Sequence, residues 1–465
     1  MSPQLTKKQN TQLTAMSHDD LIEMILTLIQ DNKQAKSTLI NQFLSTPDEM
    51  LKTIEKTYKI KTKSTRFYDY RETDTFFDEL RHDVIRLFEK VVLASPEKSE
   101  SLLYWMLVDF YRICETKDTS SGYWLDYYHE LIENWFKSLS EQKQLSPQAV
   151  AQKIIAYLST EHFLDISIFK QYRKTLGLPT LRALRDTFAS QHELQDAINL
   201  SLFIKDIDFL EHARAQGGKL TILQLLDYAE LMIDELHFDK ALAILAEITP
   251  DSLQPSTDYK RWCLLKINAF NENGQKEEAK QLCLSAFGRI PLSEFYQAYS
   301  SLEKIFDEID RHFITTAAGK GPTYLIPFLK EIARFELIAE YIQQYDSELL
   351  SQMRTSLQPA FLRRLSSDLY TQGYISAAII LRRCLAEGAI LTAQSRYYAY
   401  AVSDLKKSFD YSIAMNTEES ILEALSYFSM LYAKHHRKVA LWSLIQEKIT
   451  QLGITNNQFV YHKNI

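Results

Sequence analysis

Residues 274–291 read GQKEEAKQLCLSAFGRIP, and a similar stretch, FDKALAILAEI, precedes them at residues 238–248. In both stretches small residues recur among larger apolar ones, which is typical of amphipathic helices that pack closely against a neighbour. Ala241 and Ala279 hold matching positions 38 residues apart, close to the 34-residue period of tetratricopeptide units with a few residues inserted. Each helix pair of this kind leaves an apolar face that the next pair must cover. The sequence therefore predicts tetratricopeptide-like helix pairs.

The predicted fold class is all-α, because the pattern of helices extends over nearly the whole chain. Residues 374–384, YISAAIILRRC, resemble the second helix of a tetratricopeptide-like unit. We predict that residues 146–465 form a helical-repeat array, an α-solenoid, and that residues 17–145 form an N-terminal helical region. Residues 1–16 are polar and are predicted to be a flexible N-terminus.

Several helix starts can be identified from capping residues. Ser17 precedes an apolar stripe and has Asp20 three positions later, and Thr46 is followed by a proline and by Glu49 in the capping-box position. Ser95 and Ser146 also stand directly before a proline that opens an apolar stripe. Within the N-terminal region the stripes are rich in aromatic residues, which we interpret as core filling between stacked helices.

Residues 59–75 carry several cations and little apolar periodicity. These cations are Lys59, Lys61, Lys63, Arg66 and Arg71. We predict a basic linker between two groups of helices. A linker of this charge could contact phosphate, although a solvated loop explains it as well.

Composition limits the classes of partner. The 465 residues include 46% hydrophobic residues, 11 glycines and 11 prolines, so residues that favour turns are scarce. A formal charge of −7 gives no bulk attraction to nucleic acid or to an anionic membrane. No apolar stretch approaches the roughly 20 residues that span a bilayer, and the polar start lacks the apolar core of a signal peptide. The sequence predicts a soluble cytoplasmic protein without a membrane helix.

Motifs for chemistry are incomplete. His129-Glu130 begins like a zinc-protease helix, but position 133 is Glu133 where a second histidine is needed. Residues 317–322 resemble a phosphate loop without its first glycine, and residues 118–122 resemble a calcium loop whose twelfth position is a histidine. We interpret both segments as turns between helices. The four cysteines are scattered and predicted to be core thiols. We predict no enzyme activity, catalytic residue, cofactor or metal.

A polar cluster stands out within the apolar C-terminal helices. Its members are Arg382, Arg383, Ser395, Arg396, Tyr397, His435, Arg437, Lys438 and Trp442. Helical spacing puts His435, Lys438 and Trp442 on one face. One interpretation is a basic groove for an acidic peptide, a phosphate or nucleic acid. The other is that these long side chains lie along helix edges or pair with nearby acids such as Glu387 and Asp404.

Several short motifs, taken in order, carry a resemblance to a known family. They are residues 118–122, 176–178, 206–208, 274–279, 286–291, 380–385, 393–398 and 436–438, with Trp442. Their order resembles an uncharacterised bacterial helical family that is similar to the helical region following the zinc finger in bacterial SWIM zinc-finger proteins. A SWIM finger needs a Cys-x-Cys pair, which this chain lacks. The resemblance therefore implies a helical fold and carries over neither the zinc site nor an activity.

Two functions remain as hypotheses. The first is a protein-interaction scaffold that binds another protein or a peptide on surfaces formed by stacked helix pairs. The alternative is a nucleic-acid-associated accessory protein that contacts the phosphate backbone through local basic clusters, although the net charge does not favour it. The sequence does not indicate an oligomeric state.

Overall fold

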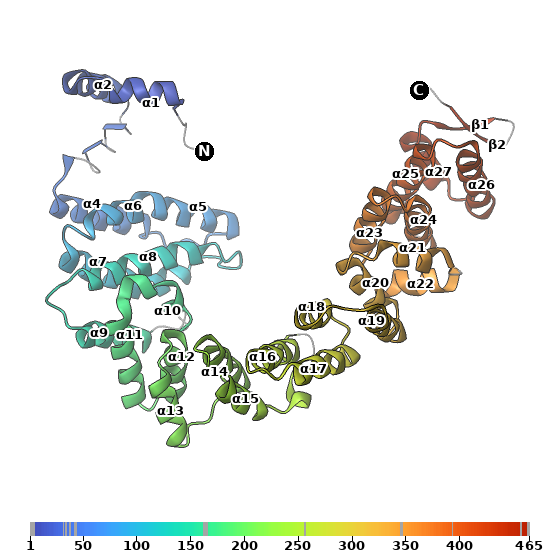
Figure 1. The fold of residues 1–465 in the computed structure, drawn as a ribbon. Helices are drawn as coiled ribbons and strands as arrows, with labels where there is room; N and C mark the ends of the chain where they lie inside the picture. The colour runs from blue at the N-terminus through green and yellow to red at the C-terminus, as the bar shows by residue number, and fades with distance from the viewer. Residues whose placement is uncertain are drawn as a thin grey trace. The chain divides into compact units, whose positions relative to one another are not determined.

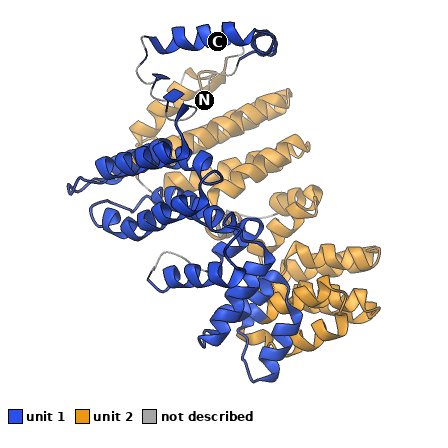
Figure 2. Ribbon diagram, turned by 90° about the vertical axis from the view of Figure 1, so that its left-hand side faces the viewer, with its two compact units in different colours: residues 1–224 blue, residues 225–465 orange. Residues whose placement is uncertain are grey.

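The structure is a computed structural model, and it describes residues 5–30, 32, 35–36, 39–40, 44–160, 166–254, 257–344, 347–392, 394–455 and 458–462. Helices make up almost all of its regular structure, which confirms the all-α class (Figure 1). The chain divides into two compact units, residues 1–224 and 225–465 (Figure 2). Helix α14 (Ile222–Asp234) crosses this division.

The first unit begins with two helices that bury no residue and continues with a packed group of helices. Its helices are α1 (Lys7–Thr14), α2 (His18–Gln30), α4 (Pro47–Lys61), α5 (Tyr70–Leu80), α6 (Arg86–Val91), α7 (Pro96–Cys114), α8 (Trp124–Ser140), α9 (Pro147–Leu158), α10 (Ile168–Gln171), α11 (Arg173–Ser190), α12 (Leu194–Ile204) and α13 (Ile207–Ala215). A π-helical turn (Arg81–Ile85) joins α5 to α6, so that the two form one interrupted helix.

Local capping sets the start of several helices. The predicted cap at Ser17 is confirmed, since its Oγ accepts a hydrogen bond from the backbone nitrogen of Asp20 at 3.1 Å. The capping box at Thr46 is also confirmed, because the Glu49 side chain accepts from the Thr46 backbone nitrogen at 2.8 Å. Residues 7–14, predicted to be part of a flexible segment, instead form α1, which has a capping box of its own.

The core of the first unit is aromatic, as the sequence predicted. Trp135 is fully buried and packs edge-on against Tyr157, with ring centroids 5.2 Å apart. Its indole nitrogen donates to Oε1 of Glu100 at 3.3 Å, and the hydroxyls of Tyr128 and Tyr157 lie 2.9 Å apart. These pairings satisfy the polar ends of large buried rings. Because Tyr157 belongs to α9, the domain boundary predicted at residue 146 lies inside this unit.

The segment predicted to be a basic linker at residues 59–75 is mostly helical. Lys61 ends α4 and Arg71 lies in the first turn of α5, so only residues 62–69 connect the two helices. Asp69 caps α5 by accepting from the Glu72 backbone nitrogen at 2.9 Å, which begins that helix earlier than the charge pattern suggested. Lys61 lies 2.6 Å from Glu79. The linker prediction therefore overestimated the length of the connection.

The second unit contains helices and one short hairpin. Its elements are α15 (Phe238–Ala246), α16 (Asp258–Glu272), α17 (Lys276–Arg289), α18 (Ser293–Leu302), α19 (Asp307–Gly319), α20 (Pro322–Glu331), α21 (Phe335–Gln344), α22 (Ser347–Ser356), α23 (Pro359–Thr371), α24 (Ile375–Leu391), α25 (Tyr398–Ala414), α26 (Glu418–His435), α27 (Val439–Lys448), β1 (Leu452–Thr455) and β2 (Gln458–Tyr461). Residues 317–322 were predicted to be a turn, but only residues 320–321 form it, because residues 317–319 end α19 and Pro322 begins α20.

One type of turn recurs between paired helices of the second unit. It places a residue with a left-handed backbone at Leu236, Gly274, Ala333 and Gly373, where φ is 61°, 78°, 59° and 88°. At Gly274 the backbone nitrogen donates to the carbonyl of Asn271 at 3.0 Å, and that of Gln275 donates to Phe270 at 2.8 Å. This Schellman arrangement satisfies the last carbonyls of one helix and leads directly into the next.

Among the described residues of this unit, three contacts between two side chains join residues 34 positions apart. They are Arg261 with Asp227, Lys260 with Glu294 and Asn273 with Asp239, at 2.6, 2.9 and 2.8 Å. The interval equals the period of tetratricopeptide units. The repeated turns and this interval do not contradict tetratricopeptide-like pairs, and both these pairs and the wider solenoid stay predictions.

The C-terminal segment differs from the helical prediction. Strands β1 and β2 form an antiparallel hairpin in which Leu452 pairs with Tyr461. Phe459 of β2 is 9% exposed, and its ring centroid lies 5.9 Å from that of Trp442. Aromatic and β-branched residues of this segment favour strands, and packing on α26 gives the short hairpin the apolar support that it needs.

Candidate functional site

Arg382, a predicted binding residue, is directed into the second unit. It lies in α24 and is 8% exposed. Its Nη1 donates to Oδ1 of Asp404 at 2.8 Å, and its Nη2 donates to the carbonyl of Arg363 at 2.9 Å. Asp404, fully buried in α25, also accepts from Nη2 of Arg363 at 2.8 Å. These bonds hold α23, α24 and α25 together.

Arg383 is also paired with an acid of the same unit. Its Nη2 lies 2.8 Å from Oε2 of Glu423 in α26, and its guanidinium lies 4.1 Å from the ring centroid of Tyr427. Arg383 lines a cavity of about 320 Å³ between α24, α25 and α26, together with Glu419 and Glu423. Since two carboxylates accompany one guanidinium, this cavity does not favour an anionic ligand.

The remaining predicted residues lie around the start of α25 and the turn between α26 and α27. Ser395, Arg396 and Tyr397 form a single helical turn before α25, and the Arg396 guanidinium lies 4.8 Å from the ring centroid of Tyr397. Ser395 and Arg396 are exposed. Arg437 is exposed in the turn that follows α26. None of these four residues makes an ion pair within the residues that the structure describes.

His435, Lys438 and Trp442 meet at that turn, but the single helical face predicted from their spacing is wrong, because α26 ends at His435 and α27 begins at Val439. The indole nitrogen of Trp442 donates to the carbonyl of His435 at 3.0 Å, and Nζ of Lys438 lies 3.4 Å from the hydroxyl of Tyr398. Burial lowers the pKa of His435 below its usual value, and Lys434 and Lys438 lower it further. Trp442 is buried, so this group is largely a packed helix end.

The structure thus divides the predicted cluster. The two arginines at 382 and 383 are paired with acids, which matches the interpretation that named Asp404 as a partner. A basic groove formed by the cluster stays a prediction, and it loses the support of these two residues. The arginine pairing depends on helices brought together by the fold, which spacing along one helix does not reveal.

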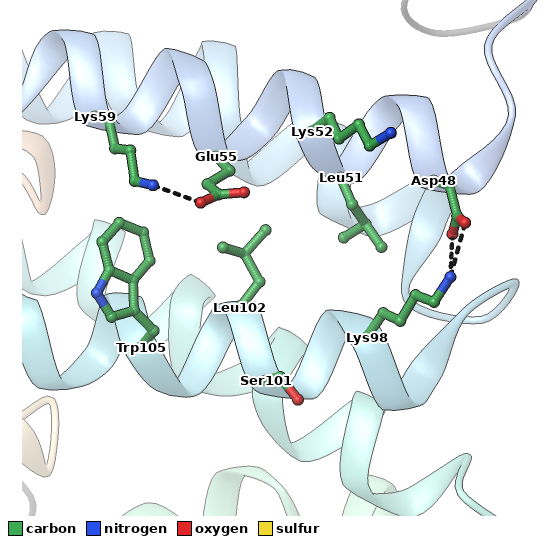
Figure 3. Close-up of a pocket in the computed structure, with 9 residues that line it drawn as sticks. All are labelled: Asp48, Leu51, Lys52, Glu55, Lys59, Lys98, Ser101, Leu102 and Trp105. Carbon is green, nitrogen blue, oxygen red and sulfur yellow. Dashed lines mark hydrogen bonds and ion pairs between the residues drawn. The ribbon is translucent and has the colours of Figure 1, made fainter.

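A different feature of the first unit has the shape of a binding site. It is an open groove of about 650 Å³ between α4 and α7, which we call the α4–α7 groove. Its lining residues are Asp48, Leu51, Lys52, Glu55 and Lys59 of α4, and Lys98, Ser101, Leu102 and Trp105 of α7. The two helices run in the same direction along the groove (Figure 3).

The floor of the α4–α7 groove is apolar. Leu51 and Leu102 project toward each other from the two helices, and Trp105 lies one turn beyond Leu102 (Figure 3). The Trp105 ring packs edge-on against Tyr58, with centroids 5.2 Å apart, and remains 37% exposed. A tryptophan whose ring packs against a buried residue and stays partly exposed offers a rigid apolar surface to a ligand.

Charged side chains form the rim of the groove. At one end Nζ of Lys98 lies 2.7 Å from Oδ2 of Asp48, and near the other end Nζ of Lys59 lies 2.5 Å from Oε1 of Glu55. Lys59 also lies 5.5 Å from the ring centroid of Trp105. Lys52 is exposed and has no ion pair in the described part of the chain. Three lysines against two carboxylates give the rim a small positive excess.

A second groove in the same unit has the opposite charge. It surrounds the π-helical turn and has a volume of about 500 Å³. Its charged lining residues are Asp78, Glu79, Arg81, Asp83, Arg86, Glu89 and Glu130, so five carboxylates face two arginines. The Arg81 guanidinium donates from Nε to Oε2 of Glu130 at 3.1 Å. This groove is a polar helix junction without an apolar floor.

Trp105 was not among the predicted site residues, although the sequence contains a signal for it. The buried stripe of α7 comprises Leu103, Met106, Leu107 and Phe110. Position 105 lies off that stripe, on the face that the helix presents to solvent. Leu102 lies one turn before it on the same face, so Trp105 belongs to an apolar patch and is not a single exposed residue.

No protein-family model, curated protein or solved structure matches this chain. The resemblance to the helical region of SWIM proteins therefore stays an expectation. Within the described residues, no helix is both long and apolar enough to cross a membrane. No group of three His, Cys, Asp or Glu side chains is arranged for a metal ion in that part of the chain. The fold and the groove define a protein of the all-α class with an apolar, charge-rimmed surface between two parallel helices.

Proposed function

We propose that this chain is a protein-interaction scaffold without catalytic activity, and that its α4–α7 groove binds an amphipathic helix with acidic flanks. The observation that carries the proposal is the exposed ring of Trp105 on a floor of leucines, between lysine-bearing rims. Helix-in-groove recognition uses such a floor for affinity and the surrounding charges for orientation and choice of partner.

The dimensions of the groove support a helical ligand. Asp48 and Lys59 are eleven residues apart on α4, which corresponds to about 16 Å along the helix axis. A ligand helix of three turns covers that length and presents apolar residues at positions i, i+3, i+4 and i+7. Acidic residues on its flanks would face Lys52, since the other two rim lysines are paired with Glu55 and Asp48.

A protein partner is favoured over nucleic acid by the pairing of the basic residues. Lys59, Lys61 and Arg66 of the predicted linker each contact a carboxylate of the same unit, as do Arg382 and Arg383 in the second unit. Cations that already neutralise protein carboxylates contribute less to binding a phosphate backbone.

The proposal can be tested by titrating a fluorescently labelled synthetic amphipathic helix with the full chain and following its anisotropy. The probe carries glutamates on its polar face, and a control probe carries lysines at those positions. We expect the acidic probe to bind more tightly at low ionic strength. Replacing Trp105 by alanine should weaken binding at least about tenfold, which is 1.4 kcal/mol.

Val108→Ala provides the matched control, because Val108 is exposed on the same helix and does not line the groove. Equal binding by the Trp105 and Val108 variants would contradict the assigned groove. Binding of a DNA duplex that weakens steeply with salt would instead support the alternative nucleic-acid function.

A further inference from the structure

Helix α2 presents an apolar face that the described residues of its unit cover only in part, since Leu21, Ile25 and Ile29 are half-buried whereas Ile22 is exposed. Its sequence, HDDLIEMILTLIQ, places Leu21, Ile25 and Ile29 at the centre of one face. None of its residues is buried, and Leu26 and Leu28 are 57% and 62% exposed. So many exposed aliphatic side chains on one short helix indicate a surface that packs against something.

The length of α2 leads to the same conclusion. A helix of 13 residues is only marginally stable alone in water, since nucleation is costly and few hydrogen bonds offset it. The cap at Ser17 helps locally, but an amphipathic helix of this length gains most of its stability by burying its apolar face. Helix α2 therefore needs a docking surface to remain folded.

The charges of α2 indicate which kind of surface this helix can dock on. The helix has three acidic residues, Asp19, Asp20 and Glu23, and no lysine or arginine. An anionic lipid surface attracts amphipathic helices with basic polar faces, so it is a poor match. The groove around the π-helical turn, with five carboxylates, would repel α2. The α4–α7 groove combines an apolar floor with an excess of lysines.

Length and connection also fit. At 1.5 Å per residue α2 is about 20 Å long, and the groove extends about 16 Å between its end contacts. Sixteen residues, 31–46, connect the end of α2 to the start of α4. Part of this segment is helical, since the backbone nitrogen of Lys36 donates to the carbonyl of Asn32 at 3.0 Å, so its reach is shorter than that of an extended chain. Even at the helical rise of 1.5 Å per residue sixteen residues correspond to about 24 Å, and tethering gives α2 an effective concentration near the groove of the order of millimolar.

We propose that α2 docks its apolar face in the α4–α7 groove of the same chain, so that a partner helix must displace it to bind. This inference rests on the proposed function of the groove. It makes α2 an internal competitor whose release regulates access to Trp105, and it assigns the groove a specific ligand sequence, residues 17–30.

Hydrogen exchange of the full chain, followed by mass spectrometry of the peptides that cover α2, tests this inference. If α2 is docked, its amides should exchange at least about ten times more slowly than those of an undocked helix. Trp105→Ala should remove this protection although α2 itself is unchanged, whereas Val108→Ala should retain it. Protection in the core helices α7 and α8 shows whether each variant is folded.

A second variant shows whether faster exchange in Trp105→Ala arises only because the loss of an aromatic ring loosens the unit. Lys52→Glu leaves the floor intact and reverses one rim charge, so it should speed exchange in α2 by a smaller factor. Protection should be independent of protein concentration over about a fiftyfold range, because the contact is within one chain. Protection that rises with concentration would identify α2 of a second copy as the occupant and would overturn the inference.

The two proposals can fail separately. If α2 exchanges at the undocked rate in the unaltered chain while a synthetic peptide of residues 17–30 still binds in a Trp105-dependent way, the internal docking is wrong and the groove is right. If that peptide does not bind even to an Ile25→Asp chain, in which α2 cannot compete, the groove assignment fails as well. Thr27→Asp, on the opposite face of α2, is the matched control for Ile25→Asp.

Discussion

Arg382 and Asp404 form an ion pair in the interior of the second unit, with Nη1 of the arginine 2.8 Å from Oδ1 of the aspartate. Asp404 is fully buried and also accepts from Arg363, so one carboxylate connects three helices. A buried carboxylate of this kind is tolerated because each of its oxygens accepts charged hydrogen bonds. Arg382, which the sequence analysis named as a binding residue, therefore helps to hold the helices of the second unit together.

Replacing Asp404 by asparagine should destabilise the second unit strongly. The change leaves the buried Arg382 guanidinium without its compensating charge, and breaking such a pair typically costs about 3–5 kcal/mol of unfolding free energy. Asp410→Asn, on the same helix, is the control because Asp410 pairs with the exposed Lys406 at 3.0 Å. A surface pair of this kind contributes no more than about 0.5 kcal/mol. Urea unfolding followed by circular dichroism would measure both, and similar losses in the two variants would refute the assigned role of Asp404.

Gly274→Ala should destabilise the turn between α16 and α17 by about 1 kcal/mol, because φ at this position is 78° and an L side chain is strained there. A Cβ at Gly274 would meet no atom of the surrounding protein within 4 Å, so the cost arises from the Cβ against the adjacent backbone of the turn. Gly288→Ala, inside α17 and equally open, should instead stabilise by up to about 1 kcal/mol. Thermal unfolding would measure both, and effects of the same sign would argue against the left-handed turn.

Two buried thiols predict how stability changes at alkaline pH. Burial raises the pKa of Cys263 to about 11 and that of Cys283 to about 12. In the unfolded chain a thiol ionises near pH 8.5, so between about pH 9 and pH 11 the unfolded state binds fewer protons. Folding stability should therefore fall as the pH rises through this range and stay constant with respect to these thiols below it. Urea unfolding midpoints should be measured from pH 7 to pH 11 for the unaltered chain and for a double variant that carries both Cys263→Ala and Cys283→Ala. The midpoint should fall less steeply with pH in the double variant, and an equally steep fall would contradict the raised pKa values.

Lys52→Glu should weaken binding of the acidic probe helix several-fold at low ionic strength and have little effect on folding. The reason is that Lys52 is an exposed rim cation, and the interaction of exposed charges is screened by salt. Lys63→Glu changes the net charge equally, but it lies beyond the end of α4. Anisotropy titrations at low and high salt would separate the two variants. A loss that persists at high salt, or that appears equally in both variants, would argue against an electrostatic role for the rim.

Local structure could be predicted from the sequence because its determinants are a few residues apart. The caps at Ser17, Thr46 and Ser146 each involve a backbone nitrogen three positions later, and all three form. Ser95 correctly marked the start of α7, but its side chain makes no capping bond. The all-α class follows from the same local signals repeated along the chain.

Longer-range features could not be predicted in the same way. Asp404 was named as one of two nearby acids, but the packing of α24 against α25 is what assigns it to Arg382, and the Glu423 partner of Arg383, 40 residues away, was not predicted. The groove lies between α4 and α7, and residues that meet across it, such as Asp48 and Lys98, are 50 positions apart in the sequence. Local patterns therefore do not reveal that these residues meet. Only Trp105, an aromatic residue off the buried stripe of its helix, indicated this surface locally. The hairpin after α27 depends on packing against α26 and was likewise missed.

Photo-crosslinking from position 105 tests the central claim most directly. Benzoylphenylalanine replaces the tryptophan in the full chain, keeps an aromatic ring on the groove floor and reacts with whatever lies against it. Illumination of dilute protein should yield crosslinks to residues 21–29 of α2 within one chain, identified by mass spectrometry, and these should disappear in the Ile25→Asp chain but remain in the Thr27→Asp chain. Crosslinks confined to α4 and α7, with none to α2, would contradict the account.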